Sequence, residues 1–316
     1  MKTIVMTGGT AGIGLAAAEQ TRRVSDVRLL VGARGKAPSD VETLPLDLGR
    51  LASVRSFAAA VEERLGEASI DALVLNAGTQ VGDIQQRTED GFEPTFAVNH
   101  LAHYLLLRLL APRLAMGAIV VITTSNLHDP KTNPIAPPEH ADAEKLARGQ
   151  VALSPTSKGA MAPMRAYAAS KLCNVMTARA LAASDLARER GLSLIAFNPG
   201  FTPGTRLTRN HGLAFRLVFA LVVPILATFQ RMNTLAGGGG LLADLALGRI
   251  TPPAGRLYAS QVKRQLTWPD PSELASDDAV TAKLWRDSAA LVGLGRPARG
   301  RMKPPFPRKP LREGMR

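Results

Sequence analysis

Cysteine is nearly absent from this chain of 316 residues, in which Cys173 is the only one. A disulfide framework is therefore excluded, and so is a metal site built on paired thiolates. No basic and apolar stretch ending in small residues, as in a secretory signal, precedes the first apolar run at residues 2–7. Together these absences predict a cytoplasmic protein.

Aromatic residues are also few, at 4%, and the 26 acidic residues are outnumbered by 39 Lys and Arg, for a net charge of +13. Such a charge can indicate nucleic acid or anionic lipid as a partner. The basic residues are not interleaved with the aromatic patterns of RNA-binding modules, so no nucleic-acid partner is expected. Residues 296–316 alone carry eight Lys or Arg against Glu313. This Pro-rich segment is predicted to be a disordered, solvated tail, with weak contact to an anionic membrane surface as the alternative.

No apolar run is long enough to span a bilayer comfortably, which takes about 20 residues. The most apolar stretch, residues 213–229, is interrupted by Arg216 and Pro224. We interpret residues 201–230 as a buried helix or a lid over an apolar ligand, with interfacial membrane contact as the alternative. No metal is expected, because the histidines lack partners at ligand spacing; they are His100, His103, His128, His140 and His211.

Seven strand-like apolar runs are present, and the first six are separated by segments of helical composition. This alternation predicts a doubly wound α/β fold with a mostly parallel, seven-stranded sheet. We expect a single domain over residues 1–295, with an insertion at 126–164 and the lid at 201–230. The runs are KTIVMT, VRLLVGA, TLPLD, DALVLNAG, AIVVITTS, LSLIAFNPG and RLYAS.

A glycine-rich turn, TGGTAGIG at residues 7–14, joins the first strand to a helix-forming stretch. Glycines allow the backbone to turn sharply and to approach a pyrophosphate, which then meets the free amides at a helix start. The turn therefore predicts a dinucleotide site. A tight turn without a ligand is the alternative.

Arg34 ends the second strand, where an acidic residue would hold a ribose 2′-hydroxyl. A guanidinium can instead pair with a 2′-phosphate, so the sequence favours NADP(H) over NAD(H). An exposed arginine without a role is the alternative. Asp47, after the third strand, could accept a hydrogen bond from the adenine amino group or cap the helix that starts near Arg50.

Tyr167 and Lys171 lie four residues apart in AYAASKLCN. On a helix this spacing places both side chains on one face, where an ammonium would favour the phenolate form of a tyrosine. The pair predicts proton exchange by the tyrosine near neutral pH. A surface pair is the alternative, because this spacing often arises by chance.

In their order and spacing, these motifs resemble the short-chain dehydrogenase/reductase family, over about 260 residues and with a Rossmann fold. The stretches VNHLAHYLLL and AYAASKLCN are similar to the branch of retinol dehydrogenases and light-dependent protochlorophyllide reductases. The matching positions are TGGTAGIG at 7–14, Asp47 with Leu48, Asn76-Ala77-Gly78, Asn99, Ser125, Tyr167 with Lys171, and NPG at 198–200.

The resemblance implies a role for each matching residue. Tyr167 would be the proton donor in reduction, Lys171 would lower its pKa and hold the ribose, and Ser125 would bond the substrate oxygen. Thr123 and Thr124 are rivals of Ser125 at the same strand end. Asn99 would anchor a water beside Lys171, although a satisfied core amide is the alternative. The implied cofactor contacts are Thr7, Gly8, Gly12, Ile13, Gly14, Arg34, Asp47, Leu48, Asn76, Ala77, Gly78, Tyr167, Lys171, Pro199, Gly200 and Thr202.

The expected function is therefore NADP(H)-dependent hydride transfer to or from a carbonyl or alcohol of a bulky lipophilic substrate. A double-bond reductase similar to protochlorophyllide reductase is one alternative, and a non-catalytic NADP-sensing protein is another. For Cys173 we expect a packing role. By resemblance alone the chain is expected to form a homo-oligomer, because family members commonly pair through two helices beside the sheet.

Overall fold

The computed structural model describes residues 1–35, 41–153, 159, 161–203 and 233–295. The basic tail at 296–316 and most of the lid at 201–230 lie outside the described residues, so the predictions for them stay predictions.

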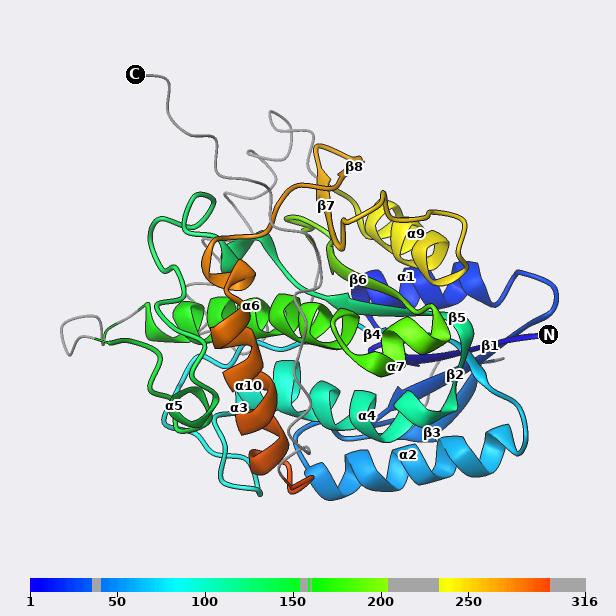
Figure 1. The fold of residues 1–316 in the computed structure, drawn as a ribbon, viewed down its shortest axis with the longest axis horizontal. Coiled ribbons are helices and arrows are strands. Elements are labelled where there is room, and N and C mark those ends of the chain that lie inside the picture. Colours follow the sequence, from blue (N-terminus) through cyan, green and yellow to red (C-terminus); the bar gives the residue numbers. More distant parts are fainter. Residues whose placement is uncertain (36–40, 154–158, 160, 204–232, 296–316) are drawn as a thin grey trace.

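One sheet runs through the molecule in the order β3-β2-β1-β4-β5-β6-β7-β8 (Figure 1). Its first seven strands are parallel, and β8 is antiparallel to β7. The seven predicted runs all form strands, whereas the predicted total of seven is wrong by one, because β8 was missed. The strands are β1 (Lys2–Thr7), β2 (Val27–Ala33), β3 (Glu42–Pro45), β4 (Ile70–Leu75), β5 (Leu114–Thr123), β6 (Ser193–Asn198), β7 (Tyr258–Val262) and β8 (Gln265–Thr267).

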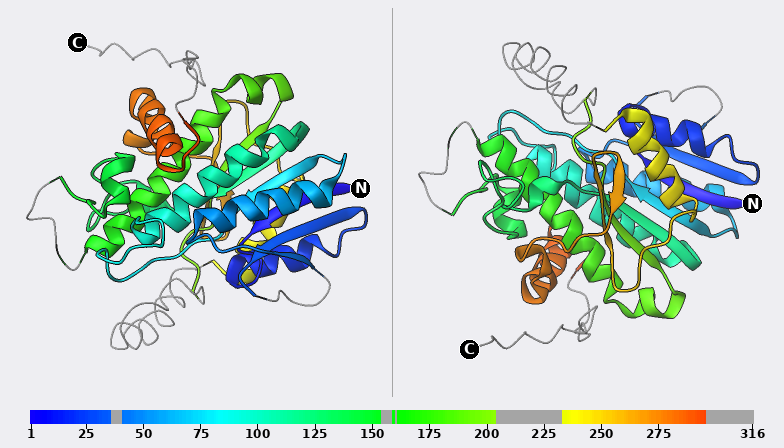
Figure 2. Two further views of the ribbon diagram at one scale, coloured as in Figure 1. Left: turned by 90° about the horizontal axis from the view of Figure 1, so that it is seen from below. Right: turned by 90° about the horizontal axis from the view of Figure 1, so that it is seen from above.

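Helices cover both faces of the sheet (Figure 2). One face packs against α1 and α9, and the other packs against α2, α4 and α6, with α10 lying across α4, α5 and α6. The doubly wound prediction is confirmed. The helices are α1 (Gly12–Thr21), α2 (Leu51–Leu65), α3 (Pro94–Phe96), α4 (Ala102–Leu110), α5 (Ala143–Ala147), α6 (Ala162–Ala182), α7 (Asp185–Arg190), α9 (Leu235–Ala246) and α10 (Asp278–Leu291).

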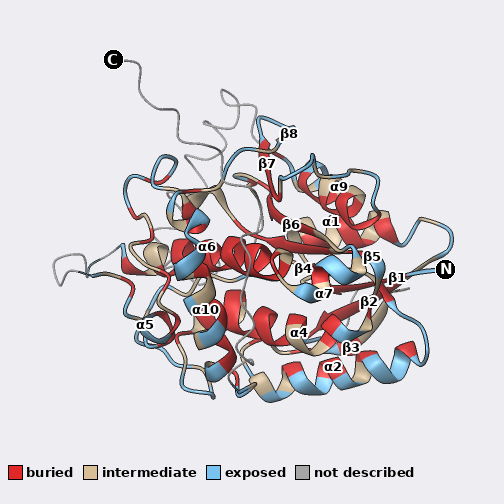
Figure 3. Cartoon of the chain, viewed as in Figure 1, coloured by how far each residue is buried: buried red, intermediate tan, exposed pale blue. Residues whose placement is uncertain are grey.

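The central strands are apolar without alternation because both of their faces are covered. Residues 3–7 of β1 and 72–75 of β4 are all buried, and α6 is buried along most of its length (Figure 3). A helix with so little exposed surface can hold polar side chains in a dry environment. Two of the predicted catalytic residues lie on it.

The predicted insertion at 126–164 is only partly loop. Its described part contains a short 3₁₀ turn, Asn126–His128, the helix α5 and the first residues of α6. Buried apolar side chains, among them Ala143, Leu146 and Val151, join this segment to the core. The helix that carries Tyr167 therefore begins at Ala162, before the predicted end of the insertion.

Candidate active site

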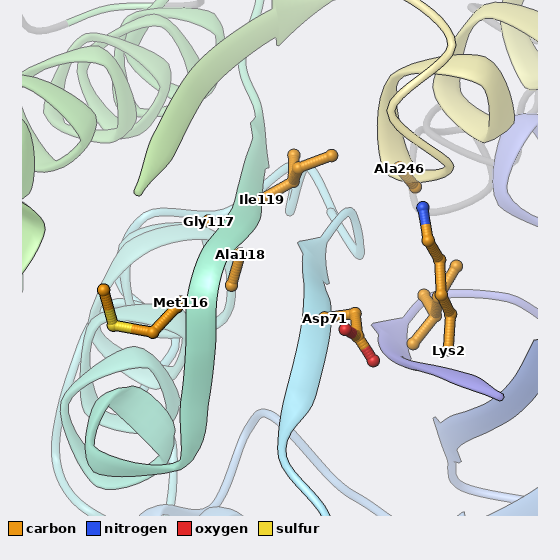
Figure 4. Close-up of a pocket in the computed structure, with 8 residues that line it drawn as sticks. Lys2, Asp71, Met116, Gly117, Ala118, Ile119 and Ala246 are labelled. Carbon is orange, nitrogen blue, oxygen red and sulfur yellow. The ribbon is translucent and has the colours of Figure 1, made fainter. Parts of the chain in front are cut away.

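The carboxyl ends of the parallel strands meet at one edge of the sheet, and the predicted site residues follow these ends. The strand order changes direction between β1 and β4. From β1 the chain adds β2 and β3 on one side of the sheet, and β4 and the later strands lie on the other side. In open α/β sheets ligands bind outside the carboxyl ends at such a switch. The pocket lined by Lys2, Asp71, Met116 and Ala246 lies at the amino ends of β1 and β4 instead (Figure 4). It is separate from the site.

The glycine turn brings the backbone of β1 against the start of α1. A Cβ at Gly14 would lie 2.0 Å from the carbonyl oxygen of Gly8, so only glycine fits there. The N-cap residue Ala11 offers no side-chain hydrogen bond to α1, whereas α5, α7, α9 and α10 all have a side-chain cap. The first amides of α1 thus have no capping side chain, which fits an anion such as a pyrophosphate.

Thr7 lies behind this turn rather than in the open site. Its fully buried hydroxyl oxygen accepts hydrogen bonds from the main-chain N–H of Asn76 (3.0 Å) and of Ala77 (3.2 Å). The Asn76 amide donates to Gly8 O (3.3 Å) and accepts from the Thr123 hydroxyl (3.1 Å). These bonds join the ends of β1, β4 and β5. The geometry gives Thr7 and the Asn76 side chain a supporting position at the predicted cofactor site.

Two predicted residues lie on the adenine side of the switch. Arg34 directly follows β2 and is exposed at the carboxyl edge. The Asp47 carboxylate accepts from the N–H of Gly49 (3.0 Å), while the first N–H of α2, at Leu51, donates to Asp90. The alternative in which Asp47 caps α2 is therefore wrong. Leu48 is buried.

Ser125 is distinguished from its two rivals by their partners. The Thr123 hydroxyl donates to Asn76, and the Thr124 hydroxyl donates to Lys171 O at 2.7 Å. Both threonines are buried, whereas Ser125 is half-buried. Its hydroxyl oxygen accepts from Leu127 N–H (3.3 Å), and its side chain interacts with the Tyr167 side chain. Among the three, Ser125 is the hydroxyl that remains accessible to a substrate oxygen.

Tyr167 and Lys171 lie in the buried part of α6, with the ammonium nitrogen 5.6 Å from the centre of the phenol ring. The Lys171 ammonium donates to Thr123 O (3.1 Å). Burial raises the pKa of Tyr167 to about 12, against a smaller lowering by the Ser125 side chain. Burial also lowers the pKa of Lys171 to about 7. The expected lowering of the tyrosine pKa by Lys171 is thus not seen, because removal from water disfavours both charged forms.

Asn99 is held on three sides. Its side chain accepts from Thr79 N–H (2.8 Å) and donates to Thr79 O (2.9 Å) and to the Ser170 hydroxyl (3.0 Å). It belongs to a π-helical turn, Ala97–Leu101, that leads into α4. Such turns often mark functional sites. A Cβ at Gly78 would lie 3.4 Å from Lys171 Nζ and 3.5 Å from Asn99 Oδ1, so these three residues meet at one point.

The NPG motif follows β6 at the same edge. Gly200 N–H donates to the Asn198 side chain (2.9 Å), and Pro199 O accepts from the Asn233 amide (2.9 Å). Thr202 is buried, with its hydroxyl 3.3 Å from Pro199 O and from Gly200 O. The motif is therefore a bonded turn beside the ends of β6 and β7.

The remaining predictions concern metals, Cys173 and membranes. Among the described residues, no group of three or more His, Cys, Asp or Glu could hold a metal ion. Cys173 is fully buried in the core, and burial raises the pKa of its thiol, in agreement with a packing role. In the part of the chain that the structure describes, none of the helices is both long and apolar enough to cross a membrane.

Two histidines that were not among the predicted site residues lie beside the site. His103 lies one helical turn after Asn99, and His128 lies three residues after Ser125; both are buried. The spacing of His103 from Asn99 was a usable signal, since residues four apart share a helix face. Nothing near His128 in the chain indicated its burial.

A sheet of this kind binds dinucleotides at the switch in strand order, and here a buried tyrosine and lysine lie beside that switch. Fold and site together define the class of nicotinamide-dependent oxidoreductases. Comparison with known proteins identifies the family. A family model described as short chain dehydrogenase matches residues 2–134.

Relatives extend the match over most of the chain. A WW domain-containing oxidoreductase of Danio rerio is 32% identical and covers 92% of this chain and 68% of its own. Protochlorophyllide reductase A of Hordeum vulgare is 30% identical, over 92% of this chain and 80% of its own. The crystal structure of an uncharacterized protein from Mycobacterium paratuberculosis has a TM-score of 0.66 at 25% identity and covers 94% of this chain and 96% of its own. The chain belongs to the short-chain dehydrogenase family and is an NAD(P)-dependent oxidoreductase.

Proposed function

We propose that this protein is an NADP(H)-dependent reductase that transfers hydride to a carbonyl group of a bulky lipophilic substrate, with Tyr167 as the proton donor. One observation carries the proposal: the Tyr167 hydroxyl interacts with the accessible Ser125 side chain, and Lys171 Nζ lies beside the same ring. A phenol and a hydroxyl that converge on one point can both donate to a single carbonyl oxygen.

The described residues fit the cofactor in two ways. The start of α1 offers amides without a capping side chain, and Lys171 Nζ and the Asn99 side chain meet beside Gly78. The reduced nicotinamide supplies the hydride when it is bound. Lys171 would hold the ribose hydroxyls. The ribose oxygens would in turn favour the charged form of Lys171, which burial alone disfavours.

Three residues of the chain carry out the proton transfer and stabilise the charges that develop. The Tyr167 phenol is fully protonated at neutral pH because burial raises its pKa to about 12, so it is ready to give a proton. Ser125 would donate to the oxygen on which negative charge develops. Lys171, as an ammonium, would stabilise the resulting phenolate until a proton returns.

Preference for NADP(H) is supported by Arg34. It follows β2 at the carboxyl edge and is exposed there, where a guanidinium could pair with a 2′-phosphate in a bidentate manner. Arg34→Asp should change the ratio of kcat/KM values for NADPH and NADH by at least about tenfold in favour of NADH. Arg23→Asp makes the same change of charge after the C-terminal end of α1, away from the glycine turn. It should leave the ratio of kcat/KM values for NADPH and NADH unaltered. An unchanged ratio in Arg34→Asp would contradict the preference.

A lipophilic substrate is supported by exposed apolar side chains near the carboxyl edge. Phe201 follows β6 and Val262 ends the neighbouring strand β7, and each is 50% exposed. Exposed apolar groups gathered at one edge commonly mark a binding surface. The segment 213–229, whose composition first suggested such a substrate, lies outside the described residues.

A screen tests the substrate class. A retinoid aldehyde, a steroid ketone, an aromatic polyketide-type ketone and a fatty aldehyde are each incubated with NADPH, in light and in darkness, and NADPH absorbance is followed. Reduction of a carbonyl compound in darkness supports the proposal. Turnover only in light, with reduction of a double bond in a conjugated ring, would favour the double-bond reductase. That alternative is supported by the similarity to protochlorophyllide reductase A of Hordeum vulgare.

A further inference from the structure

Two buried histidines contact the main chain of the proposed catalytic residues. His103 lies in α4 and His128 in the turn after β5, and they are 2% and 1% exposed. The proposed chemistry uses neither imidazole. A histidine with so little access to water needs partners for both ring nitrogens, and which nitrogen carries the proton follows from those partners.

His128 bridges Ser125 and the C-terminal part of the chain. Its Nδ1 lies 2.7 Å from Ser125 O, and its Nε2 lies 3.3 Å from the main-chain nitrogen of Ser272. A main-chain N–H can only donate, so Nε2 is the unprotonated acceptor. The proton is therefore on Nδ1, which donates to Ser125 O. The ring also packs edge-on against Tyr258, with the ring centres 5.0 Å apart.

His103 makes the corresponding bridge between Asn99 and β1. The Thr7 hydroxyl oxygen already accepts two main-chain N–H groups, from Asn76 and Ala77. The hydroxyl proton of Thr7 is therefore donated to His103 Nε2, which lies 2.9 Å away. His103 Nδ1, at 3.1 Å from Asn99 O, therefore carries the proton and donates to that carbonyl. Burial lowers the pKa of His103 to about 3, in agreement with a neutral ring.

We propose that His103 and His128 are positioning residues for the reductase site, each donating from Nδ1 to the main-chain carbonyl of a proposed catalytic residue and accepting at Nε2 from a remote element. The inference rests on the proposed function. His103 ties the π-helical turn of Asn99 to Thr7 at the start of the glycine turn, and His128 ties Ser125 to Ser272, just before α10.

An imidazole suits this task because it is rigid, neutral at ordinary pH, and has a donor and an acceptor on different edges of one ring. A displacement of about 1 Å at a catalytic group can cost on the order of 100-fold in rate. The two rings therefore set the places of Asn99 and Ser125 relative to the cofactor site without touching a reactant.

The ring protons can be located in the wild-type protein without any substrate. With ¹⁵N-labelled histidine, NMR at pH 7 should show His103 and His128 as neutral Nδ1–H tautomers, identified by their loss in single variants. A proton on Nε2, or an imidazolium, at either residue would overturn the inference for that residue. This measurement is independent of turnover and remains informative if a variant fails to fold.

Paired substitutions separate the two bonds of each ring. Asparagine places an N–H near the position of Nδ1, and glutamine places its amide oxygen near Nε2. His128→Asn should keep kcat within about threefold of the wild type, whereas His128→Gln should lower kcat at least about tenfold with little change in the KM for NADPH. His103→Gln loses the bond to Asn99 O and should lower kcat. His103→Asn loses the hydrogen bond to the Thr7 hydroxyl and should raise the KM for NADPH.

His100→Gln is the matched control. His100 is equally buried and one turn from His103, but its Nε2 partner is Ser288 and it contacts no main-chain carbonyl of the proposed catalytic residues. Because glutamine keeps an amide near Ser288, this variant should leave kcat unchanged. Equal kcat in the Asn and Gln variants at position 128 would contradict a positioning role. Failure of the proposed function would look different, as a wild-type protein that reduces no carbonyl compound.

Discussion

At the scale of single residues, the notable feature is a tyrosine and a lysine that are both buried and both shifted towards their neutral forms. Burial raises the pKa of Tyr167 to about 12 and lowers that of Lys171 to about 7. The folded-state pKa of Lys171 lies below the unfolded value of 10.5. Its ammonium therefore destabilises the fold in full below pH 7, and this cost diminishes as the pH rises towards 10.5.

Lys171→Met should separate stability from activity. Removing the buried ammonium at pH 6 should raise the free energy of unfolding by ~1–3 kcal/mol, while reductase activity is lost. The gain should shrink at pH 9, where Lys171 is already neutral in the folded protein. Thermal unfolding at both pH values measures this, with the exposed Lys145→Met as control. A variant that is less stable than the wild type at pH 6 would contradict the account.

The residues also show what a sequence can reveal about a site. The four-residue spacing predicted that Tyr167 and Lys171 share a face, and they do, because helical periodicity is local. The direction of the tyrosine pKa could not be predicted, since it depends on how completely distant elements exclude water. For the same reason the bridges of His103 and His128 were invisible, because their partners Thr7 and Ser272 lie far away in the chain.

At the scale of elements, the strands were predictable and one hairpin was not. Long apolar runs between two helical layers can hardly form anything but central strands. The strand β8 is only Gln265–Thr267, and its turn places Lys263 and Arg264 at positive φ angles of 49° and 69°. Hairpin turns of that kind are usually marked by Asn or Gly. Two basic residues gave no such signal.

Close packing of α1 against α9 is the element feature most open to test. The glycines at 237–240 belong to α9, and a Cβ at Gly239 would lie 2.5 Å from Ala16 Cβ and 2.9 Å from Ile13 O. Gly239→Ala should therefore push α9 away, lower the free energy of unfolding by ~1–3 kcal/mol and weaken NADPH binding at the glycine turn.

Gly240→Ala provides the matched control within the same helix. Its Cβ would meet only the end of the Gln20 side chain, at 3.2 Å. Since alanine favours a helix interior over glycine, stability should be unchanged or rise by up to ~1 kcal/mol. Thermal melts and NADPH titrations compare the stability and the cofactor affinity of Gly239→Ala and Gly240→Ala. Similar behaviour of both would show that α9 does not constrain the turn.

At the scale of the whole molecule, α10 covers part of α4 and α6, which are two of the helices beside the sheet. Trp285 of α10 is buried with its ring edge-on to Tyr104 of α4, and Arg179 of α6 pairs with Asp278 (2.9 Å). The Tyr104 hydroxyl also donates to Trp285 O (2.8 Å). A homo-oligomer stays a prediction, and it would need a surface other than this face of α4 and α6. A mass from light scattering, with cross-linking at these helices, tests that expectation.

The central claim is that this short-chain dehydrogenase reduces a carbonyl group with Tyr167 as its proton donor. The most direct test is the turnover of Tyr167→Phe with NADPH and a carbonyl compound that the wild type reduces. Turnover should fall by at least about 100-fold, with the Kd for NADPH within a few-fold of the wild type. Tyr104→Phe, which removes a buried hydroxyl that bonds Trp285 O and Arg108 rather than a proposed site residue, should retain wild-type turnover. A Tyr167→Phe variant that turns over as fast as the wild type would contradict the account.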